Sequence, residues 1–276
     1  MRLLNGIGKK VEWKGGGGRE EDEEEEIKWE EVKEVIKKLK GNKAAGGDEV
    51  PNEVWKFGGE GLKEWAWRMC RRIWRGEGWP ESWKEAQIVP IVKKGEGERV
   101  EQYRGVSLMP SLYKIYTTVL ADRLKGKVEE RRMLPEWQTG FRQGMGAIDN
   151  IYVLNYIINK RIGGGKAGMV AVFVDLKAAF DSVDRKVLER QLVERGVRRG
   201  LRARISEIYE ETRSRVRTRE GEGDAFWTRK GVRQGCPLSP MLFNLILADL
   251  EERLKEVGMG RSEGGRAESE GVGVRG

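Results

Sequence analysis

Histidine is absent from this 276-residue sequence, and cysteine occurs only at Cys70 and Cys236. Two cysteines cannot build a disulfide framework, and with no histidine they do not make a zinc site. The lack of histidine also removes the usual general base and every Ser-His or Cys-His nucleophile. Any catalysis by this chain must therefore depend on carboxylates and a metal ion.

Long apolar runs are missing as well. No stretch is long enough to span a membrane, and no basic start leads into an apolar signal core, so we expect no membrane partner and a cytoplasmic or nuclear location. The 53 Lys and Arg residues outnumber the 45 acidic ones, and seven of those acids lie together in residues 20–26. The remaining surface is strongly basic. It suits nucleic acid, although a solvated basic face without a specific ligand explains it too.

Composition divides the chain into four parts. Residues 1–26 join a glycine run to the acidic run, and residues 258–276 are rich in Gly, Glu, Arg and Ser, so both ends are predicted to be disordered. Between them the glycine-rich link at 163–166 separates residues 27–166 from residues 167–257. This length fits one large domain or two subdomains that share an interface.

Hydrophobic periodicity predicts both helices and strands, which favours an α+β fold. Helices are expected at residues 27–40, 61–75, 111–124, 138–160, 182–196, 203–209 and 239–254. A strand is expected at residues 86–92, and a β-hairpin is expected around the turn at residues 221–223.

A further strand is predicted just before Asp175. Residues 170–174 are almost continuously apolar, as in a strand buried on both faces. A carboxylate at the mouth of such a strand is costly to keep charged, so Asp175 is a candidate metal ligand. A turn or helix-cap role is the alternative. Asp181 or Ser182 is expected to cap the next helix. Asp181 and Asp184 are assigned mostly to capping and to the dipole of its first turn.

Residues 173–183, FVDLKAAFDSV, resemble the first catalytic motif of reverse transcriptases of non-LTR (LINE-type) retrotransposons. Other motifs follow in the family's order, at residues 79–95, 103–124, 138–157 and 231–254. Five motifs in one order make the resemblance specific, and it covers about residues 27–257. It implies a right-hand polymerase: fingers in residues 27–166, a partial palm in 167–257 with an antiparallel sheet packed by helices, and no thumb.

The resemblance implies an RNA-directed DNA polymerase. Such an enzyme transfers a deoxynucleoside triphosphate onto a DNA primer 3′-OH, copying an RNA template by two-metal chemistry with Mg²⁺. It assigns Asp175 and the backbone carbonyl of Leu176 to the metal. The nucleotide site would comprise Lys93, Lys94, Arg104, Phe180, Gln234 and Gly235.

Two of these residues also have physical arguments behind them. Gly235 allows close approach of a ligand, and Gln234 offers a donor and an acceptor. Phe180 would exclude a ribose 2′-OH by resemblance, with a core aromatic at a helix start as a close competitor.

Contacts with template and primer are expected from two segments. The resemblance gives Gln138, Phe141 and Arg142 to these strands. Arg215 and Arg217 alternate with apolar or small residues on the hairpin, a pattern that suits a phosphate backbone, although a solvated edge is an equally good explanation.

The sequence departs from the family pattern in one important respect. The family places an Ala-Asp-Asp box soon after the last helix, but no aspartate follows Asp249. We therefore expect the chain to leave the pattern before the third catalytic motif, with an incomplete metal site. Gly105 also stands where the family has proline. Two hypotheses remain: a polymerase domain that is inactive as this fragment, and a nucleic-acid-binding relic without chemistry.

Overall fold

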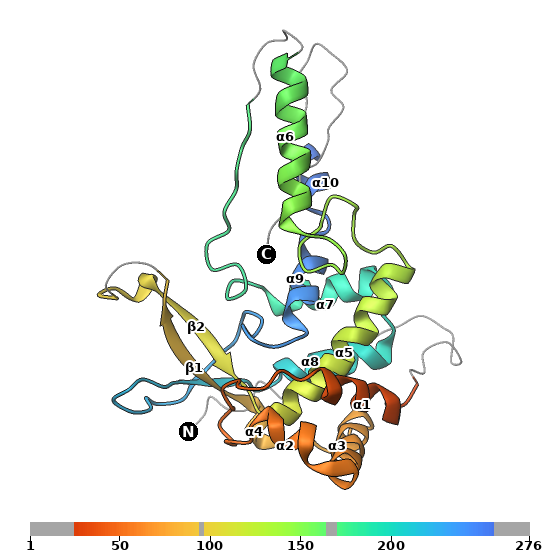
Figure 1. Cartoon of the computed structure of the whole chain (residues 1–276), viewed down its shortest axis with the longest axis vertical. Coiled ribbons are helices and arrows are strands. Elements are labelled where there is room, and N and C mark those ends of the chain that lie inside the picture. The colour runs from red at the N-terminus through yellow and green to blue at the C-terminus, as the bar shows by residue number, and fades with distance from the viewer. Residues whose placement is uncertain (1–24, 94–96, 164–169, 257–276) are drawn as a thin grey trace, which may run out of the picture.

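The computed structural model describes residues 25–93, 97–163 and 170–256, and it combines helices with one small sheet (Figure 1). The helices are α1 (Trp29–Lys38), α2 (Asn52–Phe57), α3 (Gly59–Trp74), α4 (Glu81–Lys84), α5 (Ser111–Glu130), α6 (Ala147–Gly163), α7 (Arg185–Glu194), α8 (Arg199–Tyr209), α9 (Ser239–Leu247) and α10 (Leu250–Glu256). The strands are β1 (Glu85–Val92), β2 (Tyr103–Leu108), β3 (Arg213–Val216) and β4 (Phe226–Trp227). The expected mixture of helices and strands is confirmed.

The sheet has the order β2-β1-β3-β4 and is mixed. β1 is antiparallel to β2 and β3 is antiparallel to β4, which confirms the predicted hairpin. The expectation of an antiparallel sheet is wrong for β1 and β3, which run parallel. Parallel neighbours require a long connection, and here the chain passes through α5 to α8 before β3 lies beside β1.

Residues 170–176 correct the prediction of a buried strand. They are irregular, and Val170, Phe173 and Val174 are exposed by 90%, 81% and 76%. A run of apolar residues forms a strand only where another strand satisfies its backbone groups, and the four described strands pair with one another instead. Asp175 therefore lies on an exposed loop.

The centre of the core is α5. Tyr113, Ile115, Tyr116, Leu120 and Leu124 on this helix are completely buried, which confirms its predicted core role. α5 packs against α1, α8 and α9, and Figure 1 shows it crossing the middle of the helical region.

Aromatic packing reinforces the same core. Trp83, within the short α4, meets Tyr113 of α5 edge to face with ring centroids 5.5 Å apart. Edge-to-face pairs of this kind add about 0.5–1.5 kcal/mol to the area that they bury. The helix that leads into β1 is thus attached to the core before the sheet begins.

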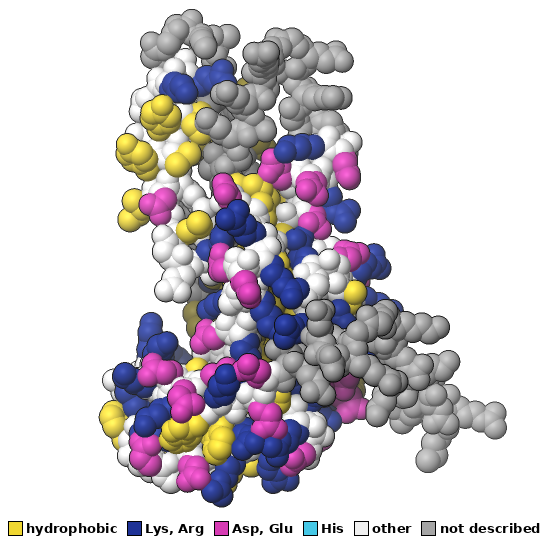
Figure 2. Space-filling view, turned by 90° about the vertical axis from the view of Figure 1, so that its right-hand side faces the viewer, with side chains coloured by type: hydrophobic (Ala, Val, Ile, Leu, Met, Phe, Trp, Pro, Cys, Tyr) yellow, Lys and Arg dark blue, Asp and Glu magenta, His cyan; other side chains and the backbone are white. Residues whose placement is uncertain are grey.

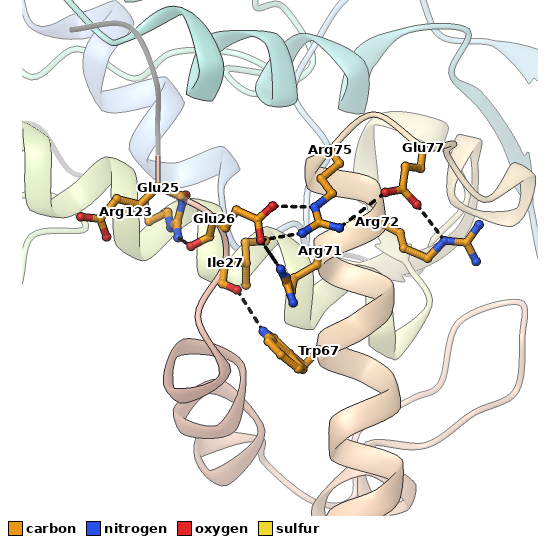
Figure 3. Close-up of polar contacts among 9 residues, drawn as sticks. All are labelled: Glu25, Glu26, Ile27, Trp67, Arg71, Arg72, Arg75, Glu77 and Arg123. Carbon is orange, nitrogen blue, oxygen red and sulfur yellow. Dashed lines mark hydrogen bonds and ion pairs between the residues drawn. The ribbon is translucent and has the colours of Figure 1, made fainter. Parts of the chain in front are cut away.

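The start of the described chain is fixed by Glu26 (Figure 3). Its carboxylate accepts hydrogen bonds from Arg75, at 2.5 Å, and from Arg71, and these bonds lower the pKa of Glu26 to about 2. Trp67 Nε1 donates to the Ile27 carbonyl at 2.9 Å. The disorder expected for residues 1–24 and 258–276 lies outside the described residues, but Glu26 itself is held by α3.

Three helix boundaries differ from the prediction. α6 begins at Ala147, because residues 138–146 form turns. α7 is capped by Asp184, whose side chain accepts from the backbone N–H groups of Lys186 and Val187. This confirms the capping role expected of Asp184, whereas Asp181 and Ser182 do not cap the helix. The last helix is split into α9 and α10.

The described residues contain neither a disulfide bond nor a candidate membrane span. Cys70 and Cys236 are both buried and unpaired. In the part of the chain that the structure describes, no helix is long and apolar enough to cross a membrane.

Candidate nucleotide-binding site

The loop of residues 231–238 lies against strand β2. The backbone N–H of Ser107 in β2 donates to the Gln234 carbonyl at 2.9 Å. Gly235 has φ +109°, and a β-carbon there would be 2.7 Å from the Ser107 carbonyl oxygen. Glycine is therefore required by the approach of two backbone segments, and this contact brings the loop to the strand that carries Arg104.

We expect Gly235→Ala to lower the free energy of unfolding by about 2–3 kcal/mol, because the new methyl group adds a backbone clash to a strained φ. Urea denaturation followed by circular dichroism would measure the change. Gly221→Ala is the matched control, since Gly221 has φ +137° but no neighbouring atom within 4 Å of an added β-carbon. Equal losses for the two variants would contradict the importance of the Ser107 contact.

Phe180 lies beside the same loop. Its carbonyl accepts from the N–H of Val232 at 2.9 Å. The Phe180 ring is half-buried, stacks on Phe243 of α9 at 4.9 Å between centroids and meets Phe141 edge to face at 6.3 Å. The competing interpretation of Phe180 as a packed aromatic at a helix start thus has direct support, and the ring still adjoins the loop that carries Gln234.

Gln138 connects its segment to α9. It is 1% exposed, and its Nε2 donates to the Asn244 carbonyl at 2.8 Å. In return, Asn244 Nδ2 donates to the Gly140 carbonyl at 2.6 Å. Gln138 therefore positions the turn that carries Phe141, and its buried side chain does not face solvent where a template strand would lie.

Phe141 and Arg142, which belong to the same motif as Gln138, differ in how free their side chains are to contact a nucleic acid. Phe141 is 43% exposed and has a left-handed backbone, with φ +56°. Arg142 pairs with Glu129 of α5 at 2.7 Å, and it also donates to the Pro135 carbonyl. A phosphate would have to compete with Glu129 for this guanidinium.

The basic residues expected to contact a triphosphate occupy exposed positions on the antiparallel pair. Arg104 in β2 is exposed opposite Ile91, and Lys93 is exposed where β1 ends. Within the described residues, neither side chain takes part in an ion pair. Lys94 lies outside the described residues.

Asp175 and Leu176 are exposed on the irregular segment that precedes α7. Across residues 25–93, 97–163 and 170–256, no group of three or more His, Cys, Asp or Glu side chains is placed so that it could hold a metal ion. Mg²⁺ requires near-octahedral oxygen coordination, and Asp175 supplies one carboxylate. Within the described residues, these two alone do not form a complete metal site.

The hairpin arginines have partners within the sheet. Arg215 pairs with Glu85 of β1 at 3.1 Å, and Arg217 Nη1 is 3.4 Å from Gln87 Oε1. Their contacts tie β3 to β1, so the arginine face seen in the sequence is at least partly structural.

One buried arginine, Arg233, and one half-buried arginine, Arg185, were not anticipated from the sequence. Arg233 is 7% exposed and donates to the carbonyls of Trp83, at 2.7 Å, and Lys84, at 2.9 Å, while its guanidinium lies 5.5 Å from the Tyr113 ring. Arg185 donates to the carbonyls of Gly231 and Thr228, and burial lowers its pKa. Arg233 thus ties the loop of residues 231–238 to α4, and Arg185 binds Gly231 of this loop and Thr228 just before it. No periodicity marks them, because each binds carbonyls that are distant in the sequence.

The comparisons with known proteins identify the family. Residues 91–261 match the family described as reverse transcriptase (RNA-dependent DNA polymerase), which is more than half of the chain. The chain belongs to this family. The matched region includes β2, the Phe180 segment and the loop of residues 231–238.

The similar proteins come from non-LTR retrotransposons. The chain is 33% identical over 227 residues to a probable RNA-directed DNA polymerase from transposon BS of Drosophila melanogaster, covering 81% of this chain and 25% of that protein. It is 27% identical over 244 residues to the RNA-directed DNA polymerase from mobile element jockey of Drosophila funebris, covering 85% and 25%. It is thus a reverse transcriptase domain of the LINE type, as its motifs predicted, and it spans about a quarter of the length of these relatives.

Proposed function

We propose that this chain acts in RNA-directed DNA synthesis, binding a deoxynucleoside triphosphate against an RNA template and a DNA primer. The observation that supports this most is the convergence of β2, the Phe180 turn and the loop of residues 231–238. Backbone hydrogen bonds from Ser107 to Gln234 and from Val232 to Phe180 join these three segments. They come from distant parts of a region that matches the reverse transcriptase family.

In this proposal, different residues bind the triphosphate and line the nucleotide pocket. Arg104, with Lys93 and Lys94, would contact the triphosphate, because the guanidinium fork and the ammonium groups suit phosphate oxygens. Gln234 and Gly235 would line the nucleotide pocket.

Template and primer would run past Phe141 and Arg142, which Gln138 positions, and along Arg215 and Arg217. Residues 27–166 would then correspond to fingers and residues 167–257 to part of a palm.

The proposed metal is Mg²⁺, with Asp175 and the Leu176 carbonyl as candidate ligands. When bound, it would stabilise the attacking and leaving oxygens of the phosphoryl transfer. Asp175 would contribute a carboxylate oxygen, the kind of ligand that Mg²⁺ prefers. The remaining carboxylates are not among the described residues that surround it.

A second candidate function is nucleic-acid binding without catalysis, and the absence of an acidic cluster in the described part of the chain favours it. Primer extension on an RNA template in Mg²⁺ or Mn²⁺ tests the two. Incorporation that requires template and primer supports the polymerase. Incorporation that Asp175→Asn abolishes contradicts the second function, whereas salt-sensitive RNA binding without any incorporation supports it for this chain.

We expect Phe180→Val to raise the use of ribonucleotides relative to deoxyribonucleotides by about tenfold. The smaller side chain would no longer clash with the ribose 2′-OH, and a clash of ~1.4 kcal/mol corresponds to a tenfold ratio of rates. The measurement is primer extension with each nucleotide class. Phe243→Val is the control, since Phe243 stacks on Phe180 but comes from α9. Loss of stability with an unchanged nucleotide ratio in both variants would show that Phe180 only packs.

A further inference from the structure

Arg185, the first residue of α7, binds three separate parts of the chain with one guanidinium group. Its Nε donates to the Gly231 carbonyl at 3.0 Å, at the start of the loop of residues 231–238. Its Nη1 donates to the Tyr209 carbonyl at 3.0 Å, at the end of α8, and to the Thr228 carbonyl at 2.9 Å, just after β4. The guanidinium fork therefore joins α8, the end of the hairpin and this loop at one point.

Neutral oxygen atoms hold the charge of Arg185. On the face shown in Figure 2, Lys and Arg side chains lie among Asp and Glu side chains. Arg185 differs, because it is half-buried and no carboxylate among the described residues pairs with it. Its Nη1 also donates to the Thr212 hydroxyl at 2.9 Å. Hydrogen bonds from a charged donor are about twice as strong as neutral ones, so these contacts are suited to fixing the position of the backbone.

The loop of residues 231–238 meets the Phe180 turn at Gly231. The Gly231 N–H donates to the Val183 carbonyl at 2.7 Å, and the N–H of the residue after it donates to the Phe180 carbonyl at 2.9 Å. The carbonyl of the same Gly231 accepts the hydrogen bond from Arg185. Arg185 therefore binds the loop at its junction with the turn.

We propose that Arg185 is a positioning residue for nucleotide selection, which sets the separation between the Phe180 ring and Gln234 without touching the nucleotide. This inference rests on the proposed nucleotide pocket at these two residues. Gln234 lies three residues beyond Gly231, so a shift at the junction would move it relative to the ring. A misplacement of about 1 Å can cost about 100-fold in rate. Loss of Arg185 would therefore weaken nucleotide binding and the discrimination against a ribose 2′-OH.

Hydrogen exchange, followed residue by residue by NMR, tests whether Arg185 holds the junction. Arg185→Gln is expected to speed exchange of the Gly231 and Val232 N–H groups at least about tenfold, because local opening of the junction becomes easier. The Arg217 N–H, which donates to the Ile88 carbonyl of β1 at 2.9 Å, is the internal control. Equal acceleration at all three N–H groups would indicate general destabilisation and would overturn the proposal.

Nucleotide binding tests whether the junction sets selectivity. Titration calorimetry with an RNA template, a DNA primer that ends in a dideoxynucleotide, Mg²⁺ and either dATP or ATP measures binding without incorporation. Arg185→Gln is expected to weaken dATP binding about tenfold and to reduce the preference for dATP over ATP by a similar factor. Arg185→Lys should restore part of both, since an ammonium group can still reach one carbonyl. Lys186→Gln, which removes the neighbouring exposed cation of α7, is the matched control.

The combination of Arg185→Gln with Phe180→Val separates positioning from a general loss of binding. If Arg185 acts through Phe180, then Arg185→Gln no longer changes the preference for dATP in the Phe180→Val background. The same change in both backgrounds, or an equal effect of Lys186→Gln, would overturn the proposal. A wild-type chain that binds no dATP would contradict the proposed function and this inference together, whereas dATP binding that Arg185→Gln leaves unchanged would contradict this inference alone.

Discussion

Asp175→Asn is expected to reduce primer extension at least about 100-fold while leaving the fold intact. Metal-assisted stabilisation of developing charge is worth several kcal/mol, and ~1.4 kcal/mol corresponds to tenfold in rate, so loss of a ligand oxygen's charge has a large effect. Asp175 is exposed on an irregular segment, and surface substitutions away from special features change stability within about ±0.5 kcal/mol. Activity and stability should therefore separate in this variant.

The control for this experiment is Asp181→Asn. Asp181 is also exposed, lies six residues further along the chain and does not cap α7, because Asp184 does. The substitution removes the same charge. The measurements are single-nucleotide incorporation in Mg²⁺ and thermal unfolding of both variants. Equal incorporation by the Asp175 and Asp181 variants would refute a metal role for Asp175.

Arg233→Leu is expected to lower the free energy of unfolding by about 3–5 kcal/mol, the largest loss that we predict for one side chain. The substitution leaves the carbonyls of Trp83 and Lys84 without their donor, and each buried unsatisfied group costs about 1–3 kcal/mol. It also removes the cation–π contact with Tyr113, worth about 2 kcal/mol when desolvated.

Urea denaturation would measure this loss, with Arg229→Leu as the control because Arg229 is exposed four residues earlier. Arg233→Lys should fall between the wild type and Arg233→Leu, since an ammonium group can reach one carbonyl but lacks the guanidinium fork. Buried charges are sometimes replaced by apolar residues without loss. If Arg233→Leu is as stable as the wild type, Arg233 is one of these replaceable buried charges and does not fix the loop of residues 231–238.

The candidate site illustrates which interactions a sequence can reveal. Gly235 and Gln234 stand out in the sequence because glycine and glutamine have distinctive conformational and hydrogen-bonding properties. Their partner, the backbone of Ser107, carries no such signal. The contact joins residues more than a hundred positions apart, and its geometry depends on where β2 lies.

Gln138 is a residue whose role the sequence alone does not reveal. A glutamine in a family motif suggests a ligand contact, because its amide both donates and accepts. The structure instead buries it against α9, where it bonds to the Asn244 carbonyl. Only packing decided whether this polar side chain faces a strand of nucleic acid or the interior.

The sequence by itself determined the local elements and the family. Periodicity and turn residues predicted α1, α3, α5, β1 and the β3–β4 hairpin, because these depend on side chains close together in the chain. Ordered motifs identified the reverse transcriptase family. Tertiary structure alone decided that β3 runs parallel to β1, that Arg233 is buried, and that the apolar segment before Asp175 lies exposed. The physical reason is that strand pairing and burial require a distant partner, which no local pattern specifies.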